Sequence, residues 1–265
     1  MSALLLSDCG EKSLADAPAA AVTTQRAVAS ATDDSAAIAS QAVSAPTSGL
    51  KRFGVMPHFG DLDTMVERRV IRVLTVYGPG RYFLEDGPRG TVQEYAAKLQ
   101  KVVNQAFNTG LLTVQVAVIP VSRDQLFPAL ASGYGDIVMA GTTITESRRA
   151  QADFTNPVSK PLKEILITGP SAPSLVSLED FSGKTVYVRL SSSYAGSVHA
   201  LSKRFVAEGN LAIRIEAVDE SLEDEDLIEM VDAGLLPWAV VDSYKPQMWQ
   251  EGFTRITVRE EDRKS

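Results

Sequence analysis

The chain has 265 residues, of which 45% are hydrophobic, so it is long enough to form two compact lobes that each have a core. Its formal net charge is -7, and it has no basic patch that could neutralise phosphates, which argues against nucleic acid as a partner. No apolar run reaches the roughly 20 residues of a membrane-spanning helix, so we expect membrane contact only through a lipid anchor.

The first ten residues contain the only cysteine of the chain, Cys9. One cysteine excludes an internal disulfide and a cysteine-based metal cluster. The run LLLSDCG at positions 4–10 resembles the end of a bacterial lipoprotein signal, in which a cysteine after a short apolar run becomes lipidated, although Asp8 stands where that motif has a small residue. We therefore predict that Cys9 is lipidated and holds the chain at the outer membrane, on the periplasmic side. The alternative is a free thiol near a disordered end.

Residues 11–59 are rich in alanine, serine and threonine and show no sustained helical or strand periodicity. Such a composition buries too little apolar surface to offset the conformational entropy that is lost on ordering. We predict a disordered tether over this segment and an ordered chain from about Gly60.

Residues 60–162 alternate between strand and helix patterns and are predicted to form the first lobe. Val70–Val76 is rich in β-branched residues, as strands are, whereas the apolar residues of Thr91–Phe107 recur at the spacing of a helix with one buried face. Strand, helix, strand, helix, strand indicates a parallel sheet, whose ligands lie beyond the carboxyl ends of the strands. The loop after Ala140 is therefore an expected site. The other elements expected here are helices at 61–69 and 123–131 and strands at 113–119 and 136–140.

The loop after Ala140 contains several threonines and leads into a helical start with two arginines. Backbone N–H groups, hydroxyls and a guanidinium beside a strand end suit a carboxylate. The alternative is that the threonines cap the next helix while the arginines lie in solvent, as most charged residues do. Spacing alone does not separate the two interpretations. The residues concerned are Thr142, Thr143, Thr145, Arg148 and Arg149.

Residues 163–245 are predicted to form the second lobe, because a Gly-Pro-Ser-Ala-Pro segment follows the strand pattern of Lys163–Thr168 and the alternation then restarts. Ser191–Ser193 lie between an expected strand and an expected helix, as the hydroxyl loop of the first lobe does. The acidic helix expected at Glu220–Asp232 is interpreted as a solvated face and not a metal site, because no histidine or Asp-x-Asp-x-Asp-Gly spacing accompanies its carboxylates. Trp238–Asp242 is the last expected core strand. Further elements are expected at 178–181, 184–189, 194–208 and 211–215.

Three phrases within residues 135–157, in the order GDIVMA, TITESR and DFTNP, resemble the signature of the family 3 periplasmic solute-binding proteins, which include the amino-acid receptors of ABC transporters. The resemblance continues through much of Val70–Asp242. The phrases at 69–77, 81–83 and 188–194 are nearer still to the N-terminal sensor domain of the membrane-bound lytic murein transglycosylase F family. This resemblance implies a two-lobed α/β fold of the periplasmic-binding-protein type, in which each lobe is a mostly parallel sheet flanked by helices.

The resemblance also implies ligand-binding roles for residues of both lobes. Arg148 falls on the family's arginine for the α-carboxylate of the ligand, and Asp242 falls on the carboxylate that receives its ammonium group. Ser192 and Ser193 fall on positions that contribute hydroxyls and amides, although helix capping alone accounts for one of the serines.

Thr142 and Thr143 are assigned to the same site. The chain departs from the amino-acid receptors at Ala140 and Gly141, where those receptors often carry ligand-contacting hydroxyl or small residues. This departure leaves the identity of the ligand open.

The loop Tyr77–Gly90 lies over the ligand in the resembling family, so Tyr82 and Phe83 are candidates for stacking against it. The alternative is that one of them closes the top of the core, and Phe83 is the better candidate for that role. In the same family the chain returns to the first lobe after the last strand of the second. Residues 246–265 are therefore interpreted as an incomplete return segment.

An enzymatic function is not expected. The two histidines, His58 and His199, support neither a histidine-based metal site nor a Ser-His-Asp relay. The transglycosylase family carries its catalytic glutamate in a separate C-terminal domain, and the sequence that identifies that domain does not occur here. We expect no metal and no cofactor.

The predicted function is that of a non-catalytic module that binds an amino acid or a small cell-wall peptide between its lobes and regulates a separate transglycosylase. The alternative is a free receptor that delivers an amino acid to an ABC permease. A third possibility is a scaffold that kept the fold and lost its ligand.

Overall fold

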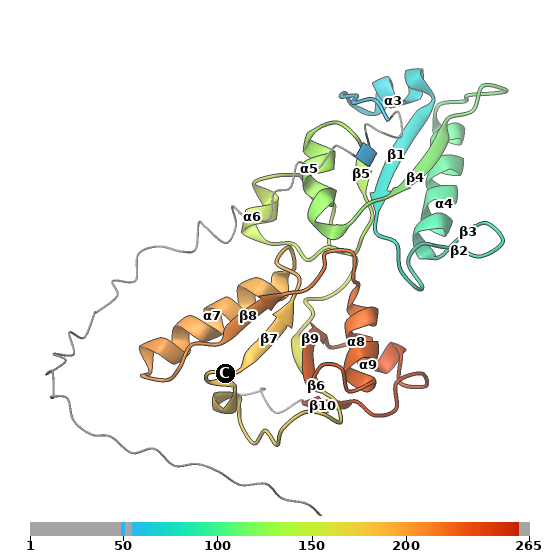
Figure 1. Ribbon diagram of the computed structural model, residues 1–265. Helices are drawn as coiled ribbons and strands as arrows, with labels where there is room; N and C mark the ends of the chain where they lie inside the picture. The colour runs from blue at the N-terminus through green and yellow to red at the C-terminus, as the bar shows by residue number, and fades with distance from the viewer. Residues whose placement is uncertain (1–48, 51–54, 260–265) are drawn as a thin grey trace, which may run out of the picture.

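The computed structural model describes residues 49–50 and 55–259, which form two lobes joined by residues 150–163 (Figure 1). The helices of the first lobe are α3 (Leu62–Arg68), α4 (Thr91–Ala106), η1 (Arg123–Gln125, a 3-10 helix), α5 (Leu126–Ala131) and α6 (Glu146–Arg149). Its strands are β1 (Val70–Thr75), β2 (Phe83–Leu84), β3 (Pro88–Arg89), β4 (Gln115–Pro120) and β5 (Ile137–Val138).

The second lobe begins with the strand that follows the connecting segment. Its helices are η2 (Leu178–Phe181, a 3-10 helix), α7 (Ser193–Ala207), α8 (Asp224–Asp232) and α9 (Lys245–Met248). Its strands are β6 (Glu164–Thr168), β7 (Thr185–Val188), β8 (Arg214–Ala217), β9 (Trp238–Asp242) and β10 (Thr257–Arg259).

The first lobe is built on a parallel sheet of order β4-β1-β5, which confirms the sheet predicted for this part of the chain. Ile71 of the central strand β1 packs against Val103 of α4, and Leu74 packs against Leu126 of α5. Residues 71 and 74 point to opposite faces of a strand, so the two helices cover opposite faces of the sheet. The carboxyl ends of the strands face the second lobe (Figure 1).

A buried ion pair fixes the segment that precedes this lobe. The Arg72 guanidinium lies 2.6 Å from the Asp136 carboxylate, and these side chains are 6% and 4% exposed. Arg72 also donates hydrogen bonds to the carbonyls of Met56 (3.1 Å), His58 (3.2 Å) and Gly133 (2.7 Å). One guanidinium therefore attaches residues 55–58 to the strands of the sheet.

The end of the expected tether is thus ordered, contrary to the prediction for residues 11–59. Leu50 is also buried, in a cluster that includes Leu74, with Val55 packed against it. The cause is a set of contacts with residues far along the chain, which the local composition does not reveal. Residues 1–48, including Cys9, lie outside the described residues, so the lipidation of Cys9 stays a prediction.

The second lobe contains a three-stranded sheet of order β10-β6-β9, which is antiparallel, and a parallel pair, β7-β8. The indole N–H of Trp238 in β9 donates to the carbonyl of Thr185 in β7 (3.0 Å), which joins the two groups of strands. The expectation of a mostly parallel sheet is therefore wrong for this lobe. The chain enters the second lobe through β6, which runs away from the first lobe. Strand β9 runs back toward the first lobe, so its last residue, Asp242, pairs with the first residue of β6, Glu164, at the end of the sheet nearest the first lobe.

Two apolar clusters stabilise the second lobe. Phe205 of α7 packs against Val186 of β7, and Ile228 of α8 packs against Ile167 of β6. The helices lie on the flanks of the strands, as Figure 1 shows. The α/β class and the two-lobed architecture agree with the prediction.

The end of the chain differs from the predicted return segment. After α9, strand β10 pairs antiparallel with β6, and Val258 packs with the cluster around Ile228. Residues 246–259 therefore belong to the second lobe. The free edge of β6 offers backbone hydrogen bonds that this segment satisfies. Residues 260–265 are not described.

Within the described ranges, no helix combines the length and the apolar character that crossing a bilayer requires.

We predict that Asp136→Asn lowers the free energy of unfolding by about 3 kcal/mol, because it leaves the buried Arg72 without its charge partner. Limited proteolysis should then cut the 55–59 segment sooner, since the same guanidinium holds that segment. Urea unfolding and timed digestion measure the two effects.

Glu85→Gln is the matched control, since Glu85 forms an exposed ion pair with Arg89 (3.8 Å) in the same lobe. It should change the free energy of unfolding by less than about 0.5 kcal/mol. Equal effects of the two substitutions would contradict a structural role for the buried pair.

Candidate ligand-binding site

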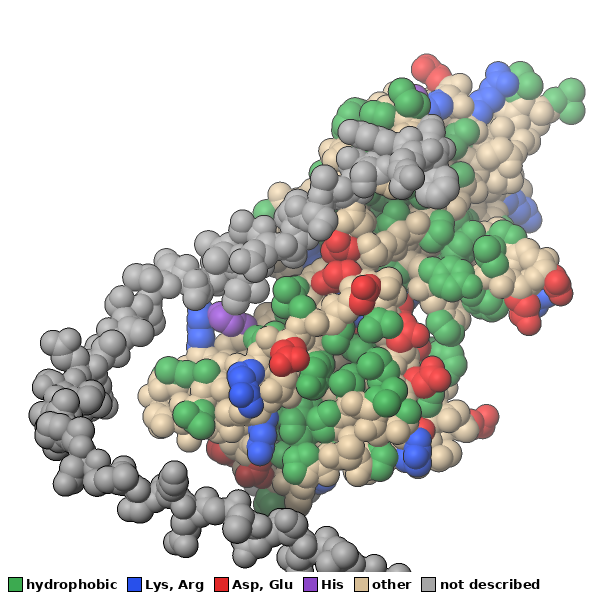
Figure 2. Space-filling view, in the orientation of Figure 1, with side chains coloured by type: hydrophobic (Ala, Val, Ile, Leu, Met, Phe, Trp, Pro, Cys, Tyr) green, Lys and Arg blue, Asp and Glu red, His purple; other side chains and the backbone are tan. Residues whose placement is uncertain are grey.

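A small cavity lies between the two lobes and collects charged residues from both. Its volume is about 30 Å³, close to the space of one water molecule. In the space-filling view the lobes meet without a wide opening on the visible face (Figure 2). The cavity is lined by Arg81, Arg123, Gly141, Thr143 and Arg148 of the first lobe and by Arg189, Ser192, Ser193, Tyr194, Asp224, Asp242, Tyr244 and Lys245 of the second.

The contributions of the first lobe come from three segments, each of which follows a strand of its parallel sheet. Arg81 follows β1, Arg123 follows β4, and Gly141, Thr143 and Arg148 follow β5. The carboxyl edge of the sheet therefore forms one wall of the cavity, where an α/β sheet places its ligands.

Arg148 spans the boundary between the lobes. Its Nη1 donates to the carbonyl of Thr143 (2.8 Å) and its Nη2 to the carbonyl of Ser191 in the second lobe (2.9 Å). The guanidinium carbon lies 5.6 Å from the centre of the Phe127 ring, within the range of a cation–π contact. Burial, together with the nearby charge of Arg123, lowers the pKa of Arg148. The guanidinium is thus a cation whose charge is poorly compensated.

The serine loop contributes unequally to the cavity. Ser192 is the N-cap of α7, and its hydroxyl accepts a hydrogen bond from the backbone of that helix. The Ser191 hydroxyl donates to the carboxylate of Glu220 (2.5 Å). Only Ser193 has its hydroxyl directed across the cavity, 3.5 Å from the hydroxyl of Thr143. Helix capping therefore accounts for Ser192, as the alternative interpretation held.

A buried ionic network forms the floor of the cavity in the second lobe. The Asp224 carboxylate pairs with Arg189 and lies 3.4 Å from the ammonium of Lys245, which also lies 2.5 Å from Glu225. The side chains of Asp224, Arg189 and Lys245 are at most 5% exposed. Burial alone would raise the pKa of Asp224, but the adjacent lysine and arginines outweigh it and lower the pKa from 3.8 to about 2.

Asp242 ends β9 and is half-buried beside this network. Its backbone N–H donates to the hydroxyl of Tyr194 (3.1 Å), which in turn donates to Asp224 (3.0 Å). Burial and the negative charge of Asp224 raise the pKa of the Asp242 carboxyl. In the part of the chain that the structure describes, this carboxylate forms no ion pair. It is an anion fixed in place by its backbone and available to a cation.

An ion pair joins the lobes directly. The guanidinium of Arg123 binds the Glu223 carboxylate through Nε (2.8 Å) and Nη2 (2.5 Å), and the Glu223 side chain is 4% exposed. Burial alone would lower the pKa of Arg123, but the hydrogen bonds and the negative charge of Glu223 outweigh it, so the pKa of Arg123 is raised. A Cβ added at Gly78 would lie 3.2 Å from the Glu223 side chain, so the lobes are in close contact here.

Five of the seven residues predicted for the site line one cavity: Arg148, Thr143, Ser192, Ser193 and Asp242. The structure does not place Thr142 among the lining residues. The hydroxyl of Thr145 accepts a hydrogen bond from the Arg148 backbone N–H (3.3 Å) and caps α6. Capping and cavity lining thus coexist in this loop.

Tyr82 is not at the cavity. Its side chain is 8% exposed and packs with Val73 and Val92 in the core of the first lobe. Tyr82 therefore closes the core, a role for which the sequence favoured Phe83, while Phe83 is half-buried elsewhere on the lobe. The residue of this loop that reaches the cavity is the preceding one, Arg81.

Sequence reasoning missed most of the charged lining. A signal was available for Arg123 and Arg189. Arg189 ends an expected strand, and Arg123 begins the helix expected after the strand at 113–119, so both lie at the same edge as the predicted site. For the buried Lys245, the only signal in the sequence was that it closely follows Asp242, the last residue of the final core strand and a predicted site residue. The missed lining residues are Arg81, Arg123, Arg189, Tyr194, Asp224, Tyr244 and Lys245.

The solvated face expected for the acidic helix is wrong at the start of α8. Glu223 and Asp224 are 3% and 4% exposed and face cations from other elements. Their position also favours negative charge, because it is at the positive end of the helix dipole. Within the described ranges, no group of three or more His, Cys, Asp or Glu residues has a metal-binding arrangement.

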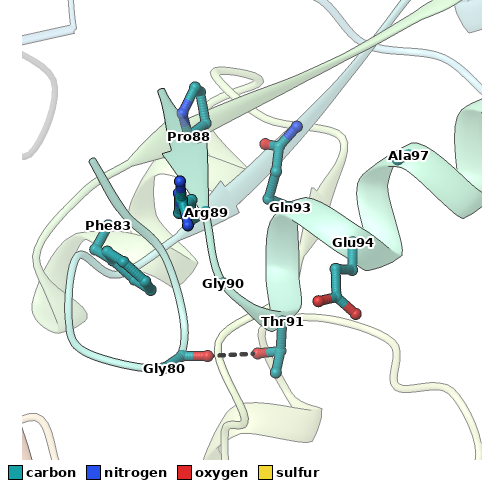
Figure 3. Close-up of a pocket in the computed structure, with 9 residues that line it drawn as sticks. All are labelled: Gly80, Phe83, Pro88, Arg89, Gly90, Thr91, Gln93, Glu94 and Ala97. Carbon is teal, nitrogen blue, oxygen red and sulfur yellow. Dashed lines mark hydrogen bonds between the residues drawn. The ribbon is translucent and has the colours of Figure 1, made fainter. Parts of the chain in front are cut away.

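A second concavity of about 600 Å³ lies on the first lobe, between the β2-β3 hairpin and the start of α4. Figure 3 shows its lining, including the hydrogen bond from the Thr91 hydroxyl to the carbonyl of Gly80 (3.1 Å). This concavity has a larger volume than the cavity between the lobes, but it is open to solvent and belongs to one lobe. The charge of its arginine, Arg89, is balanced by Glu85, which lies 3.8 Å away. Among the described residues, the smaller cavity is the one lined by buried charges and by charges that form no ion pair, so it is the candidate site.

Residues 60–256 match the sequence model of the bacterial extracellular solute-binding proteins, family 3. A membrane-bound lytic murein transglycosylase F from Desulfosudis oleivorans is 31% identical over 175 residues, which are 65% of this chain and 35% of that protein. A probable histidine-binding protein from Neisseria gonorrhoeae is 40% identical over 57 residues, 22% of this chain and 20% of that protein. The chain therefore spans about a third or less of the length of these curated relatives.

Among solved structures, an ancestral arginine-binding protein bound to arginine is 26% identical and aligns with a TM-score of 0.54, covering 72% of this chain and 78% of that one. The ancestral amino acid-binding protein AncCDT-1 is 24% identical with a TM-score of 0.56, and the alignment covers 76% of this chain and 86% of that one. The second likeness supports the fold only.

We predict that Asp224→Asn lowers the free energy of unfolding at pH 7 by about 3 kcal/mol, because Arg189 and Lys245 lose a buried counter-charge. The folded-state pKa of Asp224 lies below its ordinary value, so its stabilising contribution is complete above about pH 4 and is lost as the pH falls toward 2. The gap between the two proteins in urea unfolding should shrink over that range.

Glu229→Gln on the same helix is the control, since Glu229 is exposed. It should change the free energy of unfolding by less than about 0.5 kcal/mol. A gap for Asp224→Asn that does not depend on pH would show that the substitution acts on packing and not on charge.

Proposed function

The chain belongs to family 3 of the bacterial extracellular solute-binding proteins, and on that premise we propose that it binds an amino acid or a small peptide between its two lobes. One observation carries the proposal. Arg148 of the first lobe and Asp242 of the second line the same cavity, and neither has an ionic partner within the described ranges.

These two residues match the two ends of a zwitterion. A guanidinium binds a carboxylate through two parallel hydrogen bonds, and a carboxylate accepts from an ammonium group. The hydroxyls of Thr143 and Ser193 lie between the lobes and add neutral hydrogen-bonding groups. Recognition of both ends requires both lobes, so the ligand would hold them together.

The cavity must widen to admit such a ligand, because its 30 Å³ is far below the roughly 300 Å³ of a small-molecule pocket. Arg148 now donates to two carbonyls, and the two oxygens of a carboxylate would replace them as acceptors. One of these carbonyls, that of Ser191, belongs to the second lobe. Ligand binding is thereby coupled to a movement of one lobe against the other, as in hinge closure.

The finer proposal is that the chain serves as a non-catalytic sensor module for a murein transglycosylase, anchored in the periplasm through Cys9. The relative named membrane-bound lytic murein transglycosylase F supports it, and the match covers 35% of that protein. The alternative is a free receptor for an ABC permease, supported by the relative named probable histidine-binding protein. The genes beside the one for this chain separate the two: a transglycosylase domain favours the sensor and a permease the receptor.

The binding proposal itself is tested by calorimetry of the full chain against a panel of amino acids and muropeptides. Saturable binding of one ligand at one site per chain is the expected result. A flat response to the whole panel would contradict it and would leave the interpretation of a scaffold without a ligand.

We predict that Arg148→Ala lowers the affinity for the bound amino acid by at least about a hundredfold, because the carboxylate loses its charged donor. The free energy of unfolding should change by less than about 1 kcal/mol, since the guanidinium mainly donates to two loop carbonyls. Arg149→Ala, which removes the exposed neighbouring arginine, is the control and should leave the affinity unchanged. Unaltered binding by Arg148→Ala would remove this residue from the site.

We predict that ligand affinity falls as the pH is lowered from 7 toward 4. The raised pKa of Asp242 makes its carboxyl neutral at a higher pH than an ordinary aspartate, and the neutral form does not attract an ammonium group. Asp242→Asn should weaken binding at pH 7 and reduce this acid-range dependence. Titrations at several pH values measure both effects, and an unchanged pH profile in Asp242→Asn would exclude the assigned role.

A further inference from the structure

The charges around the cavity do not balance. Arg123 forms an ion pair with Glu223. The two cations Arg189 and Lys245 are balanced by the two carboxylates of Asp224 and Glu225. The described part of the chain provides no ion pair for the three other charged residues of the lining. These are two cations and one anion: Arg81, Arg148 and Asp242.

A simple zwitterion satisfies one cation and the anion. It leaves one guanidinium without a counter-charge in a site that closes away from water, which is costly. A ligand with one ammonium group and two anionic groups satisfies all three residues. The ligand that completes this site therefore carries a net charge of -1.

Arg81 is positioned to meet the second anionic group. Its guanidinium lies against Gly141, where an added Cβ would be 2.7 Å from Nη1. Arg148 donates to the carbonyl of Thr143, two residues further along the same loop. Both guanidinium groups therefore lie against the same short loop, residues 141–143. One small molecule with two carboxylates can reach both of them.

The backbone of Arg81 is held in place. Its N–H donates to the carbonyl of Gly78 (3.2 Å), its carbonyl accepts from the N–H of Val92 (3.0 Å), and the next residue, Tyr82, is buried in the core. Gly141 has φ +58°, a conformation that other residues rarely adopt, and its lack of a side chain leaves the space that the guanidinium occupies. The backbone of Arg81 is thus fixed, and the absence of a side chain at Gly141 leaves room for the Arg81 guanidinium beside the cavity.

On the premise of the proposed function, we infer that the ligand is a dicarboxylic amino acid, free or at the end of a short peptide, and that Arg81 binds its second carboxylate. Arg148 and Asp242 bind the α-carboxylate and the ammonium group. Arg81 then determines the specificity for an acidic side chain. Arg148 and Asp242 bind the groups that all amino acids share.

Calorimetry of the full chain tests the inference with matched pairs of ligands. L-Glutamate and L-glutamine have the same shape and differ in the side-chain terminus, which is a charged carboxylate in the first and a neutral amide in the second. Alanylglutamate and alanylglutamine repeat the comparison for a peptide. The acidic member of at least one pair should bind at least about tenfold more tightly than its amide, the effect expected for a hydrogen bond to a charged group. Whichever acidic ligand binds more tightly identifies the free amino acid or the peptide as the source.

Arg81→Gln should reduce that preference to less than about threefold while the affinity for the amide changes little, and Arg81→Lys should keep part of it. Arg89→Gln is the matched control, because Arg89 lies in the same lobe and pairs with the exposed Glu85. It should leave the preference unchanged.

The inference is overturned if the amides bind as tightly as the acids, or if Arg81→Gln weakens both members of a pair equally. In either case an amino acid still binds, so the proposed function stands. If no ligand of these pairs or of the wider panel binds, the proposed function fails and the inference fails with it.

Discussion

The relative position of the two lobes depends on the ion pair between Arg123 and Glu223. The pair is bidentate and almost fully buried, and it connects the end of β4 with the start of α8. A buried pair of this kind adds little net stability compared with apolar packing, because desolvation consumes most of the Coulomb attraction. Its contribution is geometric: the two charges are satisfied only when the lobes are in register.

The remaining direct contacts across the cavity are also polar. Each cluster of buried hydrophobic residues in the described part of the chain draws its members from one lobe only. Each lobe therefore has its own core, and separating the lobes exposes few apolar groups there. Polar contacts can be exchanged for contacts with a ligand or with water at a small net change in free energy. This is the property that a binding site which opens and closes requires.

The sequence predicted the elements that depend on local patterns. The strand at Trp238–Asp242 has the predicted bounds, and the helix expected at Thr91–Phe107 ends one residue earlier, at Ala106. The site edge was also predictable, because parallel strands place their following loops together. The pairing of β10 could not be predicted from the sequence, because an antiparallel strand at the edge of β6 depends on a partner far away along the chain.

The role of the charged residues could not be predicted, for a related reason. A run of acidic residues before a helix has the same local pattern whether it faces solvent or an arginine a hundred positions away. Glu223 pairs with Arg123 across the boundary between the lobes, and Asp224 pairs with Arg189 from a different strand end. Such pairs carry no periodicity, so the burial of carboxylates at the start of α8 became visible only in the structure.

The net charge of the whole chain is a poor guide to the charge of its site. The chain carries a formal charge of -7, yet the described residues that line the cavity, together with their ionic partners, combine five cations with four carboxylates. Surface charges act through water and are screened within about 8 Å at physiological ionic strength, whereas charges in a closed cavity act at a lower effective dielectric. The single excess positive charge in the cavity therefore influences a bound ligand more strongly than the many negative charges outside it. An acidic protein can in this way favour an anionic ligand, and the local pairing of charges, not their total, determines which ligand the site accepts.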